Sequence, residues 1–136
     1  MGWRYLDLAD YLLIAEAILE IPAPQLARLK RLGLADSALN APAAGFGEVE
    51  AYPEFTTKAA VLCWHLVKNH PLPDGNKRAA FLALIEFAHR NGRTWTRSSG
   101  DPADTDAMIR GVVDGSVTQA KLESWIAERT SPTPVK

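Results

Sequence analysis

At 136 residues, the chain is long enough for one domain with a hydrophobic core and too short for two. Its net charge of −1 argues against a broad nucleic-acid-binding surface, and its 47% share of apolar residues is typical of a globular protein. The single cysteine excludes a disulfide within the chain, and no uncharged segment approaches the length of a membrane span. We therefore expect a cytoplasmic protein without a membrane segment and without direct nucleic-acid binding.

The first forty residues predict helices. Apolar residues at helical spacing indicate a first helix over residues 7–20, opened by Asp7. Two prolines end it, and a second, basic helix is expected over residues 25–32 with Gly33 as its stop. A short helical turn is expected over residues 34–39. Residues 42–53 carry two glycines and two prolines, so we expect a long loop or a short, loose hairpin there.

Two longer helices follow. The first covers Phe55–Asn69 and has one apolar face. The second is expected to begin at Asp74, is apolar on almost every side, and ends at Asn91 and Gly92, which makes it the central buried helix. Residues 93–99 are basic and irregular, with residues 94–96 briefly extended.

The C-terminal part predicts two more helices. One starts at Asp104 or Thr105 and ends at Gly115, and Ser116 with Gln119 forms a capping-box signature for the last. Residues 131–136 are expected to form a flexible tail. The chain is thus predicted to be a compact all-α domain of roughly six to eight helices over residues 1–130.

The entrance of the central helix concentrates reactive side chains. Residues 70–78 read His-Pro-Leu-Pro-Asp-Gly-Asn-Lys-Arg. The prolines favour a loop that feeds a helix N-terminus, where backbone N–H groups and the helix dipole bind anions, and Lys77 and Arg78 add full charges. Singly, each residue also has an ordinary interpretation, because Asp74-Gly75 is a common turn pair and His70 suits a helix end. From the residues alone, a phosphate site and a plain charged helix end both stay open.

Other chemistries have less support. The segment isn't a Walker loop, because the upstream glycine is missing and Arg78 stands where Ser or Thr would bind magnesium. Zinc is not expected, since the histidines are poorly spaced and the only thiol has no partner. Cys63 falls on the apolar face of its helix, which argues against a nucleophilic cysteine.

The nine-residue string resembles the signature of the Fic/Doc family, and specifically its Doc (death-on-curing) toxin branch. The resemblance implies a compact α-helical fold and a set of roles. His70 would be the general base for a target hydroxyl, and Asp74 would hold Mg²⁺ against the phosphates of ATP. Lys77 and Arg78 would neutralise charge on the transferred group. The residues implied at ATP or phosphate are Gly75, Asn76, Lys77 and Arg78.

The resemblance also bears on the reaction. Fic enzymes that transfer AMP carry glycine where this chain has Lys77 and a second arginine where it has Leu82. In Doc-like proteins this change accompanies transfer of the γ-phosphoryl group, so the resemblance implies a protein kinase acting on Thr or Ser. There are two alternatives: an enzyme that transfers AMP, and a non-catalytic module that binds an antitoxin or nucleic acid.

Partners follow from the same resemblance. A Doc toxin belongs to a type II toxin–antitoxin system with a Phd-like antitoxin, and its expected target is elongation factor Tu, so that translation is blocked. No glutamate in this chain precedes Gly or Asn, so the self-inhibiting segment of many Fic proteins is missing and inhibition is expected in trans. A flap is expected to reach the mouth of the motif and dock the target as an added strand, and a mobile connector without a role is the alternative. Its residues are Gly45, Phe46, Gly47 and Tyr52.

Overall fold

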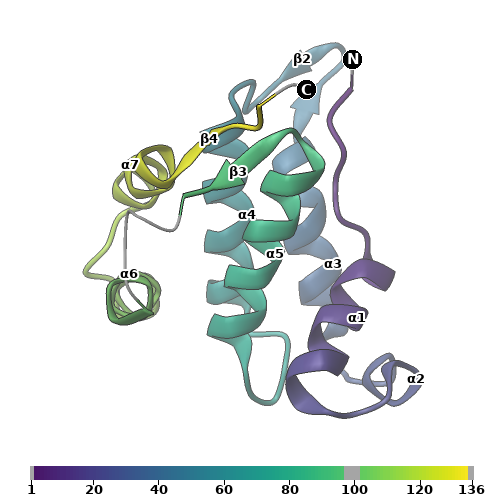
Figure 1. Cartoon of the computed structure of the whole chain (residues 1–136). Helices are drawn as coiled ribbons and strands as arrows, with labels where there is room; N and C mark the ends of the chain where they lie inside the picture. The colour runs from purple at the N-terminus through teal and green to yellow at the C-terminus, as the bar shows by residue number, and fades with distance from the viewer. Residues whose placement is uncertain (1, 97–101, 135–136) are drawn as a thin grey trace.

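The computed structural model describes residues 2–96 and 102–134, which hold seven α-helices and two small antiparallel strand pairs (Figure 1). The helices are α1 (Leu8–Leu19), α2 (Ala23–Leu26), α3 (Leu32–Asn40), α4 (Phe55–Asn69), α5 (Asn76–Arg90), α6 (Pro102–Asp114) and α7 (Gln119–Arg129), with a 3₁₀ turn at Ala41–Ala43. Strand β1 (Gly45–Phe46) pairs with β2 (Val49–Glu50), and β3 (Arg93–Trp95) pairs with β4 (Thr130–Pro132). The predicted all-α fold is confirmed.

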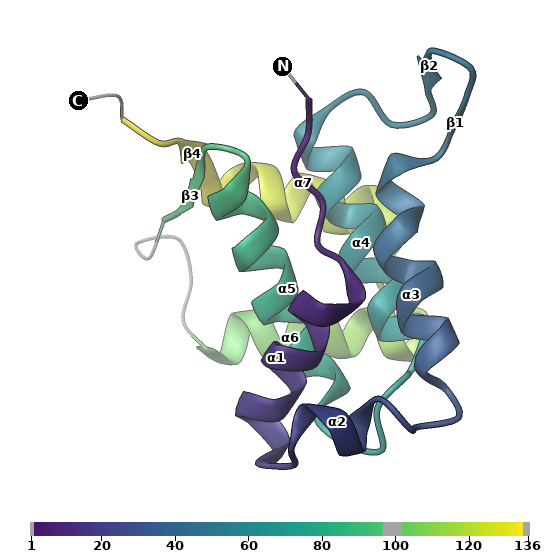
Figure 2. The same ribbon diagram turned by 90° about the vertical axis from the view of Figure 1, so that its right-hand side faces the viewer.

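Helices α4 and α5 form the centre of the molecule and run in opposite directions (Figures 1 and 2). Helix α4 packs against α3, α5 and α7, whereas α5 packs against α1 and β3. Ala79, Ala80 and Ala83 of α5 are fully buried, so the backbones of the central helices can approach closely. The ring of Phe87 stacks on Tyr5 and Phe55, which ties the N-terminal segment and both helices together. The predicted central buried helix is therefore present.

Helix α1 begins at the predicted place. Asp7 caps it, and its carboxylate accepts from the Asp10 N–H at 2.8 Å, while the Asp10 carboxylate accepts from the Asp7 N–H at 2.9 Å. The Asp10 carboxylate also accepts two hydrogen bonds from Arg90 of α5, at 2.9 and 3.0 Å. These bonds from Arg90 lower the pKa of Asp10 to about 2. The pair fixes α1 against the central helix.

The prediction for the second helix is wrong. Residues 25–32 are not one helix, since α2 ends at Leu26 and α3 continues from Leu32 through Gly33, the expected stop. The buried side chains of α3 explain this outcome: Leu32, Ala35, Ala38 and Leu39 all face the core. Their burial outweighs the modest cost of one glycine in a helix.

The C-terminal predictions need three corrections. Thr118, not Ser116, caps α7, because its hydroxyl accepts from the Lys121 N–H at 3.1 Å. Helix α6 begins at Pro102, two residues before the expected start. The expected tail is partly ordered: β4 pairs with β3, and the Thr133 N–H donates to the Gly92 carbonyl at 2.8 Å. Residues 97–99 of the expected irregular segment and 135–136 of the tail lie outside the described residues.

The segment over residues 42–53 forms the short hairpin that the sequence allowed. Its base is held by Lys58 of α4, whose side chain is fully buried. The ammonium donates to Tyr5 Oη at 2.9 Å and to the Pro42 carbonyl at 3.0 Å, and it pairs with the Glu50 carboxylate at 3.1 Å. A buried charge is tolerated here because each proton of the ammonium has a partner.

Within residues 2–96 and 102–134, none of the helices is both long and apolar enough to cross a lipid bilayer.

Candidate active site

The loop between α4 and α5 begins with a histidine in an uncommon backbone conformation. His70 caps the C-terminus of α4 with φ 49° and ψ 57°, in the left-handed region that few residues other than glycine adopt. The Arg31 guanidinium holds this turn, because its Nη2 donates to the Asn69 carbonyl at 2.8 Å and its Nε to the His70 carbonyl at 2.9 Å. The Asn69 side chain donates in turn to the Leu34 carbonyl at 3.0 Å. The His70 side chain itself is exposed.

The middle of the loop is braced by Asn76, whose side chain is only 6% exposed. Its Oδ1 accepts from the Leu72 N–H at 2.9 Å, and its Nδ2 donates to the Leu72 carbonyl at 2.8 Å. Both ends of the amide are thus engaged with the backbone of one buried residue, Leu72. This geometry makes the Asn76 side chain a brace of the loop, and its expected contact with phosphate stays a prediction. Backbone N–H groups of the first helical turn can also contribute to binding an anion.

The helix starts one residue later than a cap at Asp74 would give. Gly75 is the N-cap, with φ 73°, and a Cβ at this position would lie 2.9 Å from Ile18 Cγ2 of α1. Glycine is therefore required both by its backbone conformation and by the close approach of α1. Asp74 Oδ1 accepts from the Gly75 N–H at 2.8 Å, and its exposed carboxylate stays at the surface of the loop.

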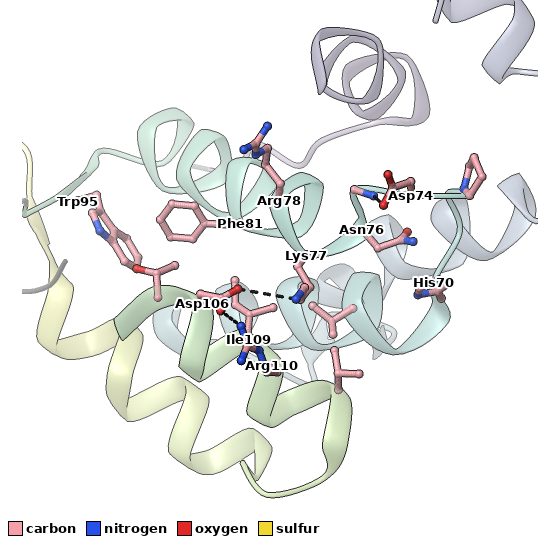
Figure 3. A pocket seen from close by; sticks show the side chains of 15 residues that line it. His70, Asp74, Asn76, Lys77, Arg78, Phe81, Trp95, Asp106, Ile109 and Arg110 are labelled. Atoms are coloured by element: carbon pink, nitrogen blue, oxygen red, sulfur yellow. Dashed lines mark hydrogen bonds and ion pairs between the residues drawn. The ribbon is translucent and has the colours of Figure 1, made fainter. Parts of the chain in front are cut away.

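A cavity of about 940 Å³ lies over this junction, between α5 and α6 (Figure 3). It is lined by His70, Pro73, Asp74, Gly75, Asn76, Lys77 and Arg78 of the motif, by Val67, Phe81 and Trp95, and by Thr105, Asp106, Ile109, Arg110 and Val113 of α6. Polar groups gather at the loop, and apolar side chains such as Phe81 and Trp95 lie further along it. The volume suits a small-molecule ligand of nucleotide size.

The two cations of the motif leave α5 in different directions. Figure 3 shows the Lys77 side chain pointing at Asp106 of α6, whereas Arg78 points away from that pair. Lys77 Nζ lies 3.7 Å from Asp106 Oδ1, and the Lys77 side chain is 47% exposed. Arg110, one turn further along α6, also pairs with the Asp106 carboxylate. Lys77 is therefore the motif cation that faces α6, the helix that forms the opposite wall of the cavity.

Comparison with known proteins bears on this arrangement. The sequence model of the Fic/DOC family matches residues 5–88, which include helices α1 to α4 and all of α5 except its last two residues. The chain belongs to the Fic/DOC family. It is also 45% identical over 65 residues to Toxin Doc of Mycolicibacterium smegmatis, an aligned stretch that covers 48% of this chain and 50% of that protein. The match thus spans about half the length of the relative. No solved structure matches the chain.

The Fic/DOC motif contributes most of its residues to one cavity. Seven of the nine line it, namely His70, Pro73, Asp74, Gly75, Asn76, Lys77 and Arg78. Leu82, in the next turn of α5, is 39% exposed and is not among the lining residues. The cavity therefore receives its further cation from α6, as Arg110, and not from the next turn of α5.

The side chains of this Fic/DOC site fit a Mg²⁺ ion that is bound by one protein carboxylate together with nucleotide phosphates and waters. In residues 2–96 and 102–134, no group of three or more His, Cys, Asp or Glu residues could enclose a metal ion. Mg²⁺ commonly takes one or two protein carboxylates, with nucleotide phosphates and waters as its other ligands. Asp74 offers such a carboxylate at the cavity, with one oxygen held by the Gly75 N–H and therefore fixed in orientation.

The expected flap doesn't reach the motif. Gly45, Phe46, Gly47 and Tyr52 belong to the β1–β2 hairpin and the segment after it, at the opposite end of α4 from the His70 loop (Figures 1 and 2). A helix of 15 residues spans about 22 Å, and none of the four residues lines the cavity. The expectation was wrong because α4 runs unbroken from the hairpin to the motif, and the buried Lys58 fixes the hairpin at the far end.

Sequence reasoning missed three residues of the site. Arg31 was placed in an ordinary basic helix, and its partners are 38 and 39 residues away, so no local spacing signals them. Asp106 and Arg110 lie outside the motif and beyond the family match. Their spacing of four on one helix is a signal for an ion pair, but it doesn't reveal that Lys77 faces them.

The exclusion of a cysteine nucleophile agrees with the structure. The Cys63 side chain is fully buried, and burial raises the pKa of its thiol to about 12. Such a thiol stays protonated at neutral pH and lacks access to a substrate.

Proposed function

We propose that this chain is a Doc-like toxin that transfers the γ-phosphoryl group of ATP to a Thr or Ser hydroxyl of a bacterial protein. The proposal rests above all on one observation: the imidazole of His70, the carboxylate of Asp74 and the ammonium of Lys77 line one nucleotide-sized cavity at a helix N-terminus. Family membership and the 45% identity to a protein named Toxin Doc support the toxin role.

In the proposed reaction, the oxygen of the target hydroxyl forms a bond to the γ-phosphorus, and the bond from that phosphorus to the β,γ-bridging oxygen breaks. ADP leaves, and the hydroxyl proton goes to a ring nitrogen of His70, which must be neutral to accept it. The Arg31 bonds hold the backbone of this histidine in place. Negative charge develops on the β,γ-bridging oxygen as the old bond lengthens, and the Lys77 ammonium is the group proposed to stabilise this charge and the transferred phosphoryl group from inside the cavity.

ATP and Mg²⁺ are the proposed cofactors of this reaction, with Asp74 as the residue that would hold the metal. Mg²⁺ bound there would neutralise phosphate charge. The N-terminus of α5 contributes backbone N–H groups, and Arg78 supplies a further positive charge at the rim of the cavity. Elongation factor Tu is the proposed target, and a Phd-like antitoxin supplied in trans is the proposed inhibitor.

The deciding experiment incubates the protein with purified elongation factor Tu, Mg²⁺ and either γ-labelled or α-labelled ATP. Transfer of the γ label and not of the α label is the expected result. Incorporation of the α label would replace the proposal with AMP transfer. Transfer of neither label to the factor or to any protein of a bacterial lysate, at a concentration where ATP binds, would favour a non-catalytic binding module.

A further inference from the structure

Helix α6 presents two charged residues to the cavity from the side opposite the motif. Asp106 and Arg110 are one helical turn apart, and both line the cavity. The Asp106 carboxylate pairs through Oδ1 with Lys77 of α5, at 3.7 Å, and through Oδ2 with the Arg110 guanidinium. The carboxylate therefore lies between two cations that come from different walls of the cavity (Figure 3).

These contacts are poorly suited to a stabilising role. The side chains of Lys77, Asp106 and Arg110 are 47%, 45% and 64% exposed. Exposed ion pairs contribute little to stability, because water screens them and two flexible side chains must be ordered. The Asp10–Arg90 pair between α1 and α5 is the contrasting case, since it is less exposed and has two hydrogen bonds of 2.9 and 3.0 Å. An anion of higher charge can displace the Asp106 carboxylate at low cost.

We propose that Arg110 is a phosphate-contacting residue, and that Asp106 is the counter-ion which fills the gap between Lys77 and Arg110 until a polyphosphate takes its place. The ligand class is the terminal phosphates of a nucleoside triphosphate, so the inference rests on the proposed function and deepens it. The planar guanidinium of Arg110 can bind two phosphate oxygens at once, while Lys77 acts as a point charge. A polyphosphate carries several negative charges against the single charge of Asp106.

Asp106 and Arg110 have effects that differ from those of the motif residues. Asp106 and Arg110 lie beyond the family match, which ends at residue 88. The motif supplies the base, the metal ligand and the first cation, and α6 adds a cation together with the anion that competes for it. Asp106 therefore lowers the affinity for polyphosphate and Arg110 raises it.

Binding of inorganic tripolyphosphate with Mg²⁺, followed by isothermal titration calorimetry on the full chain, tests the proposal. Asp106→Asn keeps the size of the side chain and removes its charge, so the dissociation constant should fall about two- to fivefold, the range that an exposed ion pair supports. Arg110→Gln should raise the dissociation constant by at least about the same factor. Glu128→Gln removes an exposed carboxylate that pairs with Arg129 outside the cavity, and Arg28→Gln removes an exposed arginine. Both controls should leave binding unchanged.

Three results would overturn the proposal: weaker or unchanged binding in Asp106→Asn, unchanged binding in Arg110→Gln, or no binding of tripolyphosphate to the unmodified chain. Asp106→Ala serves as a second variant, and circular dichroism confirms that each variant is folded. The readout doesn't involve a protein target. The expected binding pattern without transfer of the γ label would leave the phosphate contact standing and remove the kinase proposal. Transfer of the label without the binding pattern would do the reverse.

Discussion

Arg31 and His70 are joined through the backbone and not through the imidazole. The Arg31 Nε donates to the His70 carbonyl at 2.9 Å, and the same guanidinium donates to the Asn69 carbonyl at 2.8 Å. These two carbonyls end α4 without intrahelical partners, as the last carbonyls of any helix do. One side chain from before α3 thus satisfies them and fixes the left-handed turn that carries the imidazole of His70, the proposed base.

Arg31→Ala is expected to lower the rate of transfer by about tenfold to a hundredfold, because small displacements of a reacting group have effects of this size. The free energy of unfolding should change by no more than about 1–2 kcal/mol, since the bonds are at the surface. Steady-state transfer of the γ label and chemical denaturation measure the two quantities. Arg28→Ala is the matched control, an exposed arginine in the same segment. Equal transfer rates for the two variants would show that the left-handed turn at His70 does not depend on the Arg31 hydrogen bonds.

His70→Ala is expected to reduce transfer by about a hundredfold to ten-thousandfold, which is the usual contribution of a general base. The side chain is exposed and caps a helix by its backbone alone, so helix content and cooperative unfolding should persist. Transfer of the γ label and circular dichroism check the two parts. A variant that modifies its target at nearly the original rate would make His70 a structural residue only.

Asp74→Asn is the sharpest test of the metal site. Asparagine keeps an oxygen that can accept from the Gly75 N–H, so the loop should retain its shape while the negative charge is lost. In the unmodified chain, Mg²⁺ should tighten the binding of ATP, and in Asp74→Asn this dependence should largely disappear. Titration of ATP with and without Mg²⁺ measures it. The same Mg²⁺ dependence in both proteins would place the metal on other groups.

Asn76→Ala separates the observed brace from the expected phosphate ligand. The substitution removes two hydrogen bonds and leaves the buried Leu72 N–H and carbonyl without partners, at a cost of about 2–4 kcal/mol in the free energy of unfolding. A variant with unchanged stability and weakened nucleotide binding would restore the role as a ligand. Urea denaturation followed by tryptophan fluorescence provides the measurement.

Acid should weaken the contact between α1 and α5. The pKa of Asp10 is about 2 in the folded chain, below its ordinary value of 3.8, because Arg90 donates to the carboxylate. A lowered pKa contributes stability that is fully present above pH 4 and is lost as the pH falls through the folded value. Asp10→Asn should therefore be less stable than the unmodified chain at pH 6, by about 1–2 kcal/mol, and the difference should shrink toward pH 2. A difference that is constant over this range would contradict the assignment.

The two central helices could be predicted from sequence because both local signals and burial agree there. Phe55–Asn69 is observed at its predicted bounds, and the end of α5 at Arg90 precedes the predicted Asn91 and Gly92 stop. The helix 25–32 fails because the packing of α3 on the core outweighs a glycine. Strand β4 was not predicted, because its partner β3 lies nearly forty residues earlier in the chain.

In the candidate site, too, the features set by local sequence could be predicted and those set by tertiary packing could not. Its motif residues are contiguous, so a nine-residue string predicts that they meet. Asn76 illustrates the limit, since the family resemblance implied a phosphate contact and did not indicate that the amide also braces the loop. Arg31 and Asp106 come to the cavity and its loop through tertiary structure, which no spacing within the motif encodes. The hairpin was misplaced because proximity in sequence was taken as proximity in space, whereas the unbroken helix α4 separates the hairpin from the motif.

The two walls of the cavity come from separate stretches of the chain, one around α5 and the other in α6. Under the proposed function, a mutation in α6 would alter which phosphate donor is held, and how tightly, without changing the residues proposed to perform the reaction. In this proposal, the wall around α5 carries the residues that take part in the reaction, and the wall formed by α6 only contacts the ligand. If the proposal holds, members of the Fic/DOC family should differ in donor preference through substitutions in the α6 wall while their motif wall stays the same. An inhibitor designed to distinguish them would then gain its selectivity from contacts with α6.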